Sequence, residues 1–121
     1  MTLKEAIDRF DLLYPNVMSI SSKREVISRL DGRISAEIYS GYPELQTRFE
    51  GYDETTPGSS VLLAFFPFDD IYIKALSAEN DAVNGDIARY NNSAALFNAS
   101  WEQFSSYVSR NYRHKASFIN C

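Results

Sequence analysis

The stretch from Phe68 to Tyr112 constrains the fold of this chain more strongly than any other part of the sequence. Its apolar residues recur mostly three or four positions apart, which is the period of an α-helix rather than of a strand. Asp69 is a good N-cap, and Phe68 before it and Ile73 after it can close a hydrophobic staple. The sequence therefore predicts a helical region that begins at Asp69. The apolar stripe of this region consists of Tyr72, Leu76, Val83, Ile87, Tyr90, Ala94, Phe97, Trp101, Phe104 and Val108.

The length of this region predicts that it folds back on itself. A single helix over 70–112 would be roughly 65 Å long at 1.5 Å per residue. A compact domain of this size has a radius of gyration of only about 14 Å. Residues 84–86 offer a glycine C-cap followed by a new N-cap, and residues 91–93 offer a second polar break with arms of more nearly equal length. We expect a helical hairpin and leave both break points open.

Two capping boxes predict two further helices before this region. The segments 2–5 and 22–25 each place a serine or threonine three residues before a glutamate. The first helix should end before Tyr14-Pro15, because a residue that precedes proline is driven out of the helical region. The second should run to about Ile38 and close at 41–43, where a glycine and a proline follow.

The connection over 44–66 loses the helical period. Apolar and polar residues alternate over 45–49, turn formers dominate 51–60, and 61–66 is a compact apolar run. This pattern predicts a short β-hairpin or extended arm that protrudes between the second and third helices. A two-stranded hairpin would be only marginally stable alone and would need the helices, or another subunit, to pack against.

The size and composition predict one domain. The chain has 121 residues, of which 45% are apolar, enough to build one core. We therefore expect a mainly α fold over residues 1–121, a small helical bundle with long C-terminal helices. The tail from about residue 113 has no strong pattern and should fray.

Charge and cysteine content argue against several classes of protein. A net charge of −4 and a pI near 4.9 argue against nucleic-acid binding, sequence-specific or general, because phosphate contacts need clustered basic residues. The single cysteine, Cys121, cannot form an intramolecular disulfide, so a reduced, intracellular setting is the default. No apolar run approaches the roughly 18 residues of a membrane span, and no signal-peptide pattern opens the chain. We expect no membrane partner.

No residue pattern predicts catalysis. The one histidine, His114, lies among Arg110, Arg113 and Lys115, where cations stabilise a helix C-terminus without any ligand. A lone histidine without a nucleophile is a poor catalytic candidate. Di-iron and EF-hand ligand patterns are absent, the glycines are scattered, and helix capping explains the acidic pair at 69–70. We expect no enzyme activity, no metal site and no cofactor.

Several residues are candidates for contacts with partner proteins. Tyrosine and tryptophan are favoured in interfaces, and a basic aromatic cluster ends the long helical region. Two polar residues fall close to the apolar stripe, where they would fix register or face another subunit. The candidate interface residues are Phe49, Tyr52, Asp53, Glu79, Asn80, Tyr107, Arg110, Tyr112 and Arg113.

Four segments carry a resemblance to a known family. They are Leu30–Ile34 with Glu37-Ile38, Gly51–Asp53, Pro67–Tyr72 and, above all, Ala82–Ala99. In these segments the chain resembles small proteins encoded among the structural genes of tailed phages and prophages of Gram-positive bacteria. This family is of the head–tail connector, or head-completion adaptor, type. The tail over 113–121 departs from it.

The resemblance implies a non-enzymatic virion protein. Such a protein docks on the phage portal as a homo-oligomeric ring, seals the DNA-filled head and contacts neighbouring connector or tail proteins. It would occupy the host cytoplasm during assembly and the head–tail junction afterwards. The competing hypothesis is a small helical binding protein or regulator encoded on a mobile element. Portal and capsid genes upstream with tail genes downstream would favour the connector.

Overall fold

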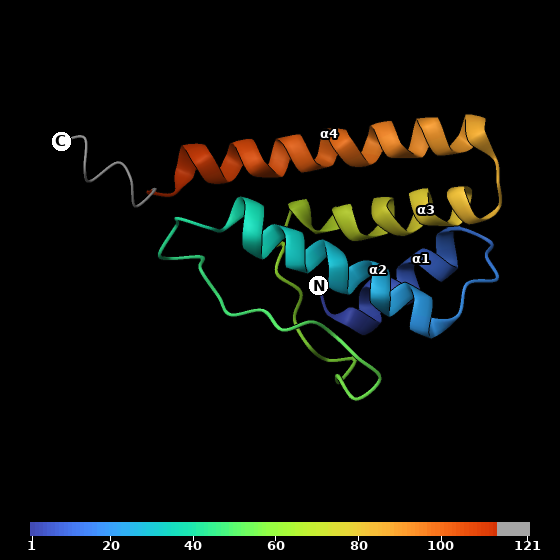
Figure 1. Ribbon diagram of the computed structural model, residues 1–121, viewed down its shortest axis with the longest axis horizontal. Coiled ribbons are helices and arrows are strands. Elements are labelled where there is room, and N and C mark those ends of the chain that lie inside the picture. The colour runs from blue at the N-terminus through green and yellow to red at the C-terminus, as the bar shows by residue number, and fades with distance from the viewer. Residues whose placement is uncertain (114–121) are drawn as a thin grey trace.

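A long antiparallel helical hairpin forms one side of the molecule. The computed structural model describes residues 1–113, and in it α3 (Ile71–Val83) lies beside the N-terminal part of the longer α4 (Ile87–Asn111) (Figure 1). The predicted hairpin is therefore confirmed, with its turn at the first of the two candidate sites. Gly85 adopts a φ of 71°, a left-handed conformation that glycine tolerates best, and the Asp86 carboxylate accepts a hydrogen bond from Arg89 N at 3.1 Å.

Two further helices pack on the other side of α3. They are α1 (Leu3–Leu13) and α2 (Ile20–Arg33). The predicted capping box at Thr2 is confirmed, because its hydroxyl accepts from Glu5 N and the Glu5 carboxylate accepts from Thr2 N.

The predicted start of α2 is wrong. Ser19 is the N-cap, and its hydroxyl accepts from Ser22 N at 3.0 Å. The serine that was expected to cap the helix thus lies inside its first turn. At the other end α2 continues into a π-helical turn, Ile34–Ile38, where Tyr39 N donates to Ile34 O at 2.8 Å. The expected end near Ile38 is confirmed.

The predicted N-cap of the third helix is also wrong. A 3₁₀ turn, Phe68–Asp70, comes first, and α3 begins at Ile71 without a side-chain cap. The Asp69 carboxylate instead lies 3.7 Å from the amino group of Met1, and Asp70 pairs with Lys74 at 3.0 Å. Both acids therefore bind cations instead of capping backbone N–H groups.

The core lies where α3 meets the other helices. Figure 1 shows α4 on one side of α3, with α1 and α2 on the opposite side. Aromatic rings extend the core under the C-terminal half of α4, where Phe104 contacts Tyr39, Phe65 and Phe68 at centroid distances of 5.4–5.9 Å. The fully buried apolar residues include Leu3, Ala6, Phe10, Ile27, Ile34, Ala64, Ile71, Tyr72, Leu76 and Phe104.

The β-hairpin predicted between the second and third helices does not form. Within residues 1–113 the connection over 42–67, named here the α2–α3 connection, makes one isolated antiparallel bridge, from Val61 to Thr2. Apart from local turns, such as Thr56 N to Asp53 O, its backbone groups bond to the helices and the N-terminus. Leu3 N donates to Ser60 O at 2.9 Å and Tyr52 N donates to the Ser28 hydroxyl at 2.9 Å. Its alternating apolar residues therefore pack on helices. The tail predicted to fray lies almost entirely outside the described residues, as do His114, Lys115 and Cys121.

Candidate interaction surfaces

A buried carboxylate fastens the α2–α3 connection to the bundle. Asp31 on α2 is fully buried, and it accepts hydrogen bonds from the hydroxyls of Tyr52 at 2.6 Å and Tyr72 at 2.5 Å. It also accepts from Leu63 N at 3.1 Å. Burial raises the pKa of the Asp31 carboxyl, and these three hydrogen bonds oppose the rise because they stabilise the charged form. Asp31 is thus a structural anchor with no access for a substrate.

Two further tyrosine contacts complete this anchor. The Tyr72 oxygen accepts from Ala64 N at 2.7 Å, and the Tyr39 hydroxyl donates to Leu63 O at 2.5 Å. The connection is therefore held at its backbone by side chains of α2, the following π turn and α3. This arrangement fixes Tyr52 and its neighbour Asp53 beside α2.

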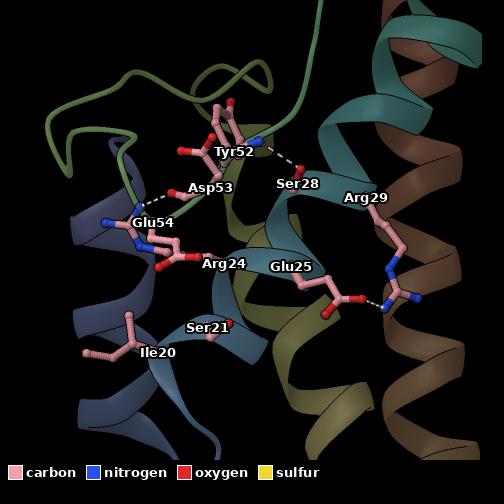
Figure 2. Close-up of a pocket in the computed structure, with 9 residues that line it drawn as sticks. All are labelled: Ile20, Ser21, Arg24, Glu25, Ser28, Arg29, Tyr52, Asp53 and Glu54. Atoms are coloured by element: carbon pink, nitrogen blue, oxygen red, sulfur yellow. Dashed lines mark hydrogen bonds and ion pairs between the residues drawn. The ribbon is translucent and has the colours of Figure 1, made fainter.

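An open groove of about 780 Å³ lies between α2 and the α2–α3 connection (Figure 2). The Arg24 guanidinium crosses it and donates to Asp53 O at 2.6 Å and Thr56 O at 2.9 Å. Glu25 and Arg29 pair along the helix at 2.6 Å. Arg24, Glu25, Ser28, Arg29 and Asp53, which line the groove, all make hydrogen bonds within the chain.

The Asp53 carboxylate also makes its hydrogen bonds within the chain. Its carboxylate accepts from the hydroxyl and the backbone N of Thr55, at 2.6 and 2.8 Å. These hydrogen bonds lower the pKa of the Asp53 carboxyl. Across residues 1–113, no group of three or more His, Cys, Asp or Glu side chains is arranged to hold a metal ion.

The nine predicted interface residues occupy three separate places. Phe49 and Tyr52 make an edge-to-face contact at 4.9 Å, and Tyr52 and Asp53 line the groove. Glu79 and Asn80 lie on α3; Asn80 is buried and its amide donates to Pro15 O at 3.5 Å, so it fixes the linker between α1 and α2.

The remaining four candidates gather at the C-terminal end of α4. Tyr107 packs on Phe68 at 4.8 Å, and with Arg110 it lines a shallow hollow beside that ring. Tyr112 caps the helix, with its N donating to Val108 O, and Arg113 is the last described residue. The structure thus brings together the members of each group, but the three groups do not form one surface.

A surface that the sequence analysis missed lies at the end of the molecule opposite this one. Here the linker after α1 and the α3–α4 turn come together (Figure 1), and the Asn80 to Pro15 hydrogen bond joins them. Eight exposed large apolar residues lie on the two segments 12–20 and 83–90, and we name this set the apolar end. They are Leu12, Leu13, Tyr14, Val17, Ile20, Val83, Ile87 and Tyr90.

The turn at Gly85 explains why the apolar end is exposed. Val83, Ile87 and Tyr90 belong to the apolar stripe that was predicted to face the core. Because the chain reverses between them, they flank the turn, where Val83 and Tyr90 line open hollows beside α2 and stay exposed. The stripe and the break site were both visible in the sequence, and combining them would have placed apolar residues at a hairpin tip.

Within residues 1–113, no helix combines the length and the apolar character needed to cross a bilayer. No family model, curated protein or solved structure matches the chain.

Proposed function

We propose that this protein is a non-enzymatic virion component of the head–tail connector type, which docks on the phage portal as a ring during assembly. The observation that carries the proposal is the apolar end, because exposed apolar residues on two adjoining segments are typical of protein–protein contact sites. The resemblance over Ala82–Ala99 narrows that binding role to the connector. This segment includes the α3–α4 turn and part of the apolar end.

The polar architecture supports a binding role over an enzymatic one. Asp31 is enclosed by its three donors, and Arg24 and Asp53 in the groove are bonded within the chain. A catalytic site needs groups that converge on a substrate. The groove, and the shallow hollow that Tyr107 and Arg110 line, are further surfaces that a ring subunit would offer to the portal and to tail-side neighbours.

Mass measurement of the purified protein mixed with the portal ring of the same phage or prophage tests the proposal. A stoichiometric ring complex is the expected result. A protein that stays apart from the portal, and whose gene lies outside a block of portal, capsid and tail genes, would refute the connector role. That result would favour the small helical regulator.

A further inference from the structure

We propose that a second groove, between α2 and α4, binds a basic amphipathic helix of another protein. The inference goes beyond the proposed function, because it applies equally to a connector and to a small helical regulator. It rests on an uncovered face of α3, on two adjoining hollows with apolar lining, and on a carboxylate in both hollows that is unpaired within residues 1–113.

The groove exists because α2 and α4 both pack on α3 without packing closely on each other. Ala75 and Ala78 of α3 form part of its floor. At one end the Arg33 guanidinium lies 4.4 Å from the centroid of the Trp101 ring, and this contact joins α2 to α4. At the other end the groove opens beside Val83, a member of the apolar end. We name this feature the helix groove.

Two hollows, of about 360 and 320 Å³, make up the helix groove. They are continuous, because Val26, Arg29 and Glu79 line both of them. Val83 adds apolar surface to the first hollow, and Phe97 adds it to the second. The helix groove is therefore one surface with a largely apolar lining.

A helix is the partner element that fits this surface. The floor over residues 75–83 is roughly 12 Å long at 1.5 Å per residue, which matches about two turns of a partner helix. Such a helix would place apolar residues three or four positions apart into the two hollows. The other common mode of peptide binding extends a sheet edge, and residues 1–113 contain no strand that would offer one.

The charges of the helix groove specify a basic partner. Glu25 pairs with Arg29 at 2.6 Å and Glu37 pairs with Arg33 at 2.9 Å, so both cations that line the groove are neutralised along α2. The Glu79 carboxylate makes no ion pair or hydrogen bond with any residue of 1–113. A lysine or arginine beside the apolar face of the partner helix would pair with it. The net charge of −4 also favours the approach of a basic partner.

Tryptophan fluorescence tests the inference. Trp101 is the only tryptophan of the chain, and its ring lies 6.3 Å from the ring of Phe97 in the helix groove. The probes are two tryptophan-free synthetic helices of roughly 15 residues, built of leucine and alanine with either lysine or glutamate beside the apolar face. At roughly 150 mM salt the lysine peptide should bind the full chain saturably and more tightly than the glutamate peptide.

Three variants show where the peptide binds. Glu79→Lys should weaken binding of the lysine peptide at least about tenfold and strengthen binding of the glutamate peptide, because it reverses the charge in the helix groove. Ala78→Leu should weaken binding without a change of charge, because it fills the floor. Glu44→Lys is the matched control: it makes the same charge change at an exposed residue of the α2–α3 connection that lines neither hollow, and it should preserve binding. Circular dichroism would verify that each variant folds.

Three results would overturn the inference. They are binding of neither peptide, a preference of the wild-type chain for the glutamate peptide, and a Glu44→Lys effect as large as that of Glu79→Lys. The last result would mean that the overall charge of the chain, rather than the helix groove, holds the peptide.

Mixing with the portal ring remains a separate test of the connector role. Peptide binding in the helix groove without any portal complex would keep this inference and reject the connector role. A portal complex formed by a chain that binds neither peptide would keep the connector role and reject this inference.

Discussion

Asp31 shows how one residue decides the path of a long connection. A buried carboxylate is unfavourable unless donors surround it, and here two tyrosine hydroxyls and one backbone N–H do so. Two of the three donors, Tyr52 and Leu63, come from the α2–α3 connection. The hydrogen bonds that two strands would have exchanged are thus replaced by bonds to a helix side chain.

Replacing Tyr72 by phenylalanine should destabilise the fold by about 1.5–3 kcal/mol, the usual range for a hydrogen bond to a charged group. The change removes the donor at 2.5 Å from Asp31 and the acceptor of Ala64 N. Urea unfolding would measure it. Tyr14→Phe, at an exposed position of the apolar end, should change the free energy of unfolding far less. Equal effects of the two substitutions would contradict the anchoring role of Asp31.

The same network predicts a loss of stability in alkali. Burial raises the pKa of Tyr39, Tyr52 and Tyr72 above the ordinary value of 10.0, and the nearby charge of Asp31 raises it further. The folded chain therefore keeps protons that the unfolded chain loses. The resulting stability is fully present below about pH 10, and it is lost as the pH rises from there toward the folded-state values.

Unfolding measured between about pH 9 and 11 would test this loss. Each of the three tyrosines should contribute about 1.4 kcal/mol per pH unit once the unfolded chain ionises. The Tyr72→Phe variant should show a shallower decline, because one titrating group is gone. A free energy of unfolding that stays level over this range would show that these hydroxyls ionise as readily in the fold as outside it.

At the scale of elements, the hairpin could be predicted but its turn could not. The three-four spacing runs through both candidate breaks, so periodicity alone does not distinguish them. The polar residues at 91–93 serve a different purpose: the Ser93 hydroxyl donates to Asp81 across the hairpin at 2.7 Å. An isolated sequence does not show whether a serine caps a helix or joins two of them.

The β-hairpin prediction was wrong for a related reason. Over 45–49 every second residue is apolar, which indicates that these residues contact an apolar surface on one side. A helix can supply that surface as well as a neighbouring strand. Which partner is present depends on long-range contacts such as Tyr52 to Asp31, 21 residues apart. The predicted helix starts at Ser22 and Asp69 were wrong for the same reason. Ser19 caps α2 in place of Ser22, and the Asp69 carboxylate pairs with the amino group of Met1.

Two glycine substitutions should have different effects on stability, because one glycine lies in the α3–α4 turn and the other inside a helix. Gly85→Ala should cost about 1 kcal/mol, because φ is 71° and alanine is strained there even though nothing lies within 4 Å. Gly32 lies inside α2, and a Cβ added there would lie 3.8 Å from the Phe49 ring, an ordinary contact. Gly32→Ala should therefore be neutral or stabilise the fold by up to about 1 kcal/mol. Thermal unfolding compares the two, and a stabilising Gly85→Ala would refute the assigned turn.

At the scale of the whole molecule, the three groups of predicted interface residues and the apolar end differ in how far the sequence specifies them. Tyr52, Asp53 and Tyr107 were chosen for their residue types, and each lines a hollow of the surface. Asn80 was chosen because it lies near the stripe, and it is an internal contact. The apolar end depends on the fold, since residues 12–20 and 83–90 meet only after the hairpin packs on α1.

Site-specific photo-crosslinking in cells that assemble the virion tests most directly whether the apolar end is an interface. A photoreactive residue at Ile87 should crosslink to another protein, either a second copy of this chain or a neighbouring virion component. The same residue at Val61, which is equally exposed on the α2–α3 connection, should give little product. Crosslinks from position 61 with none from position 87 would contradict the account, because the partner would then cover a different face.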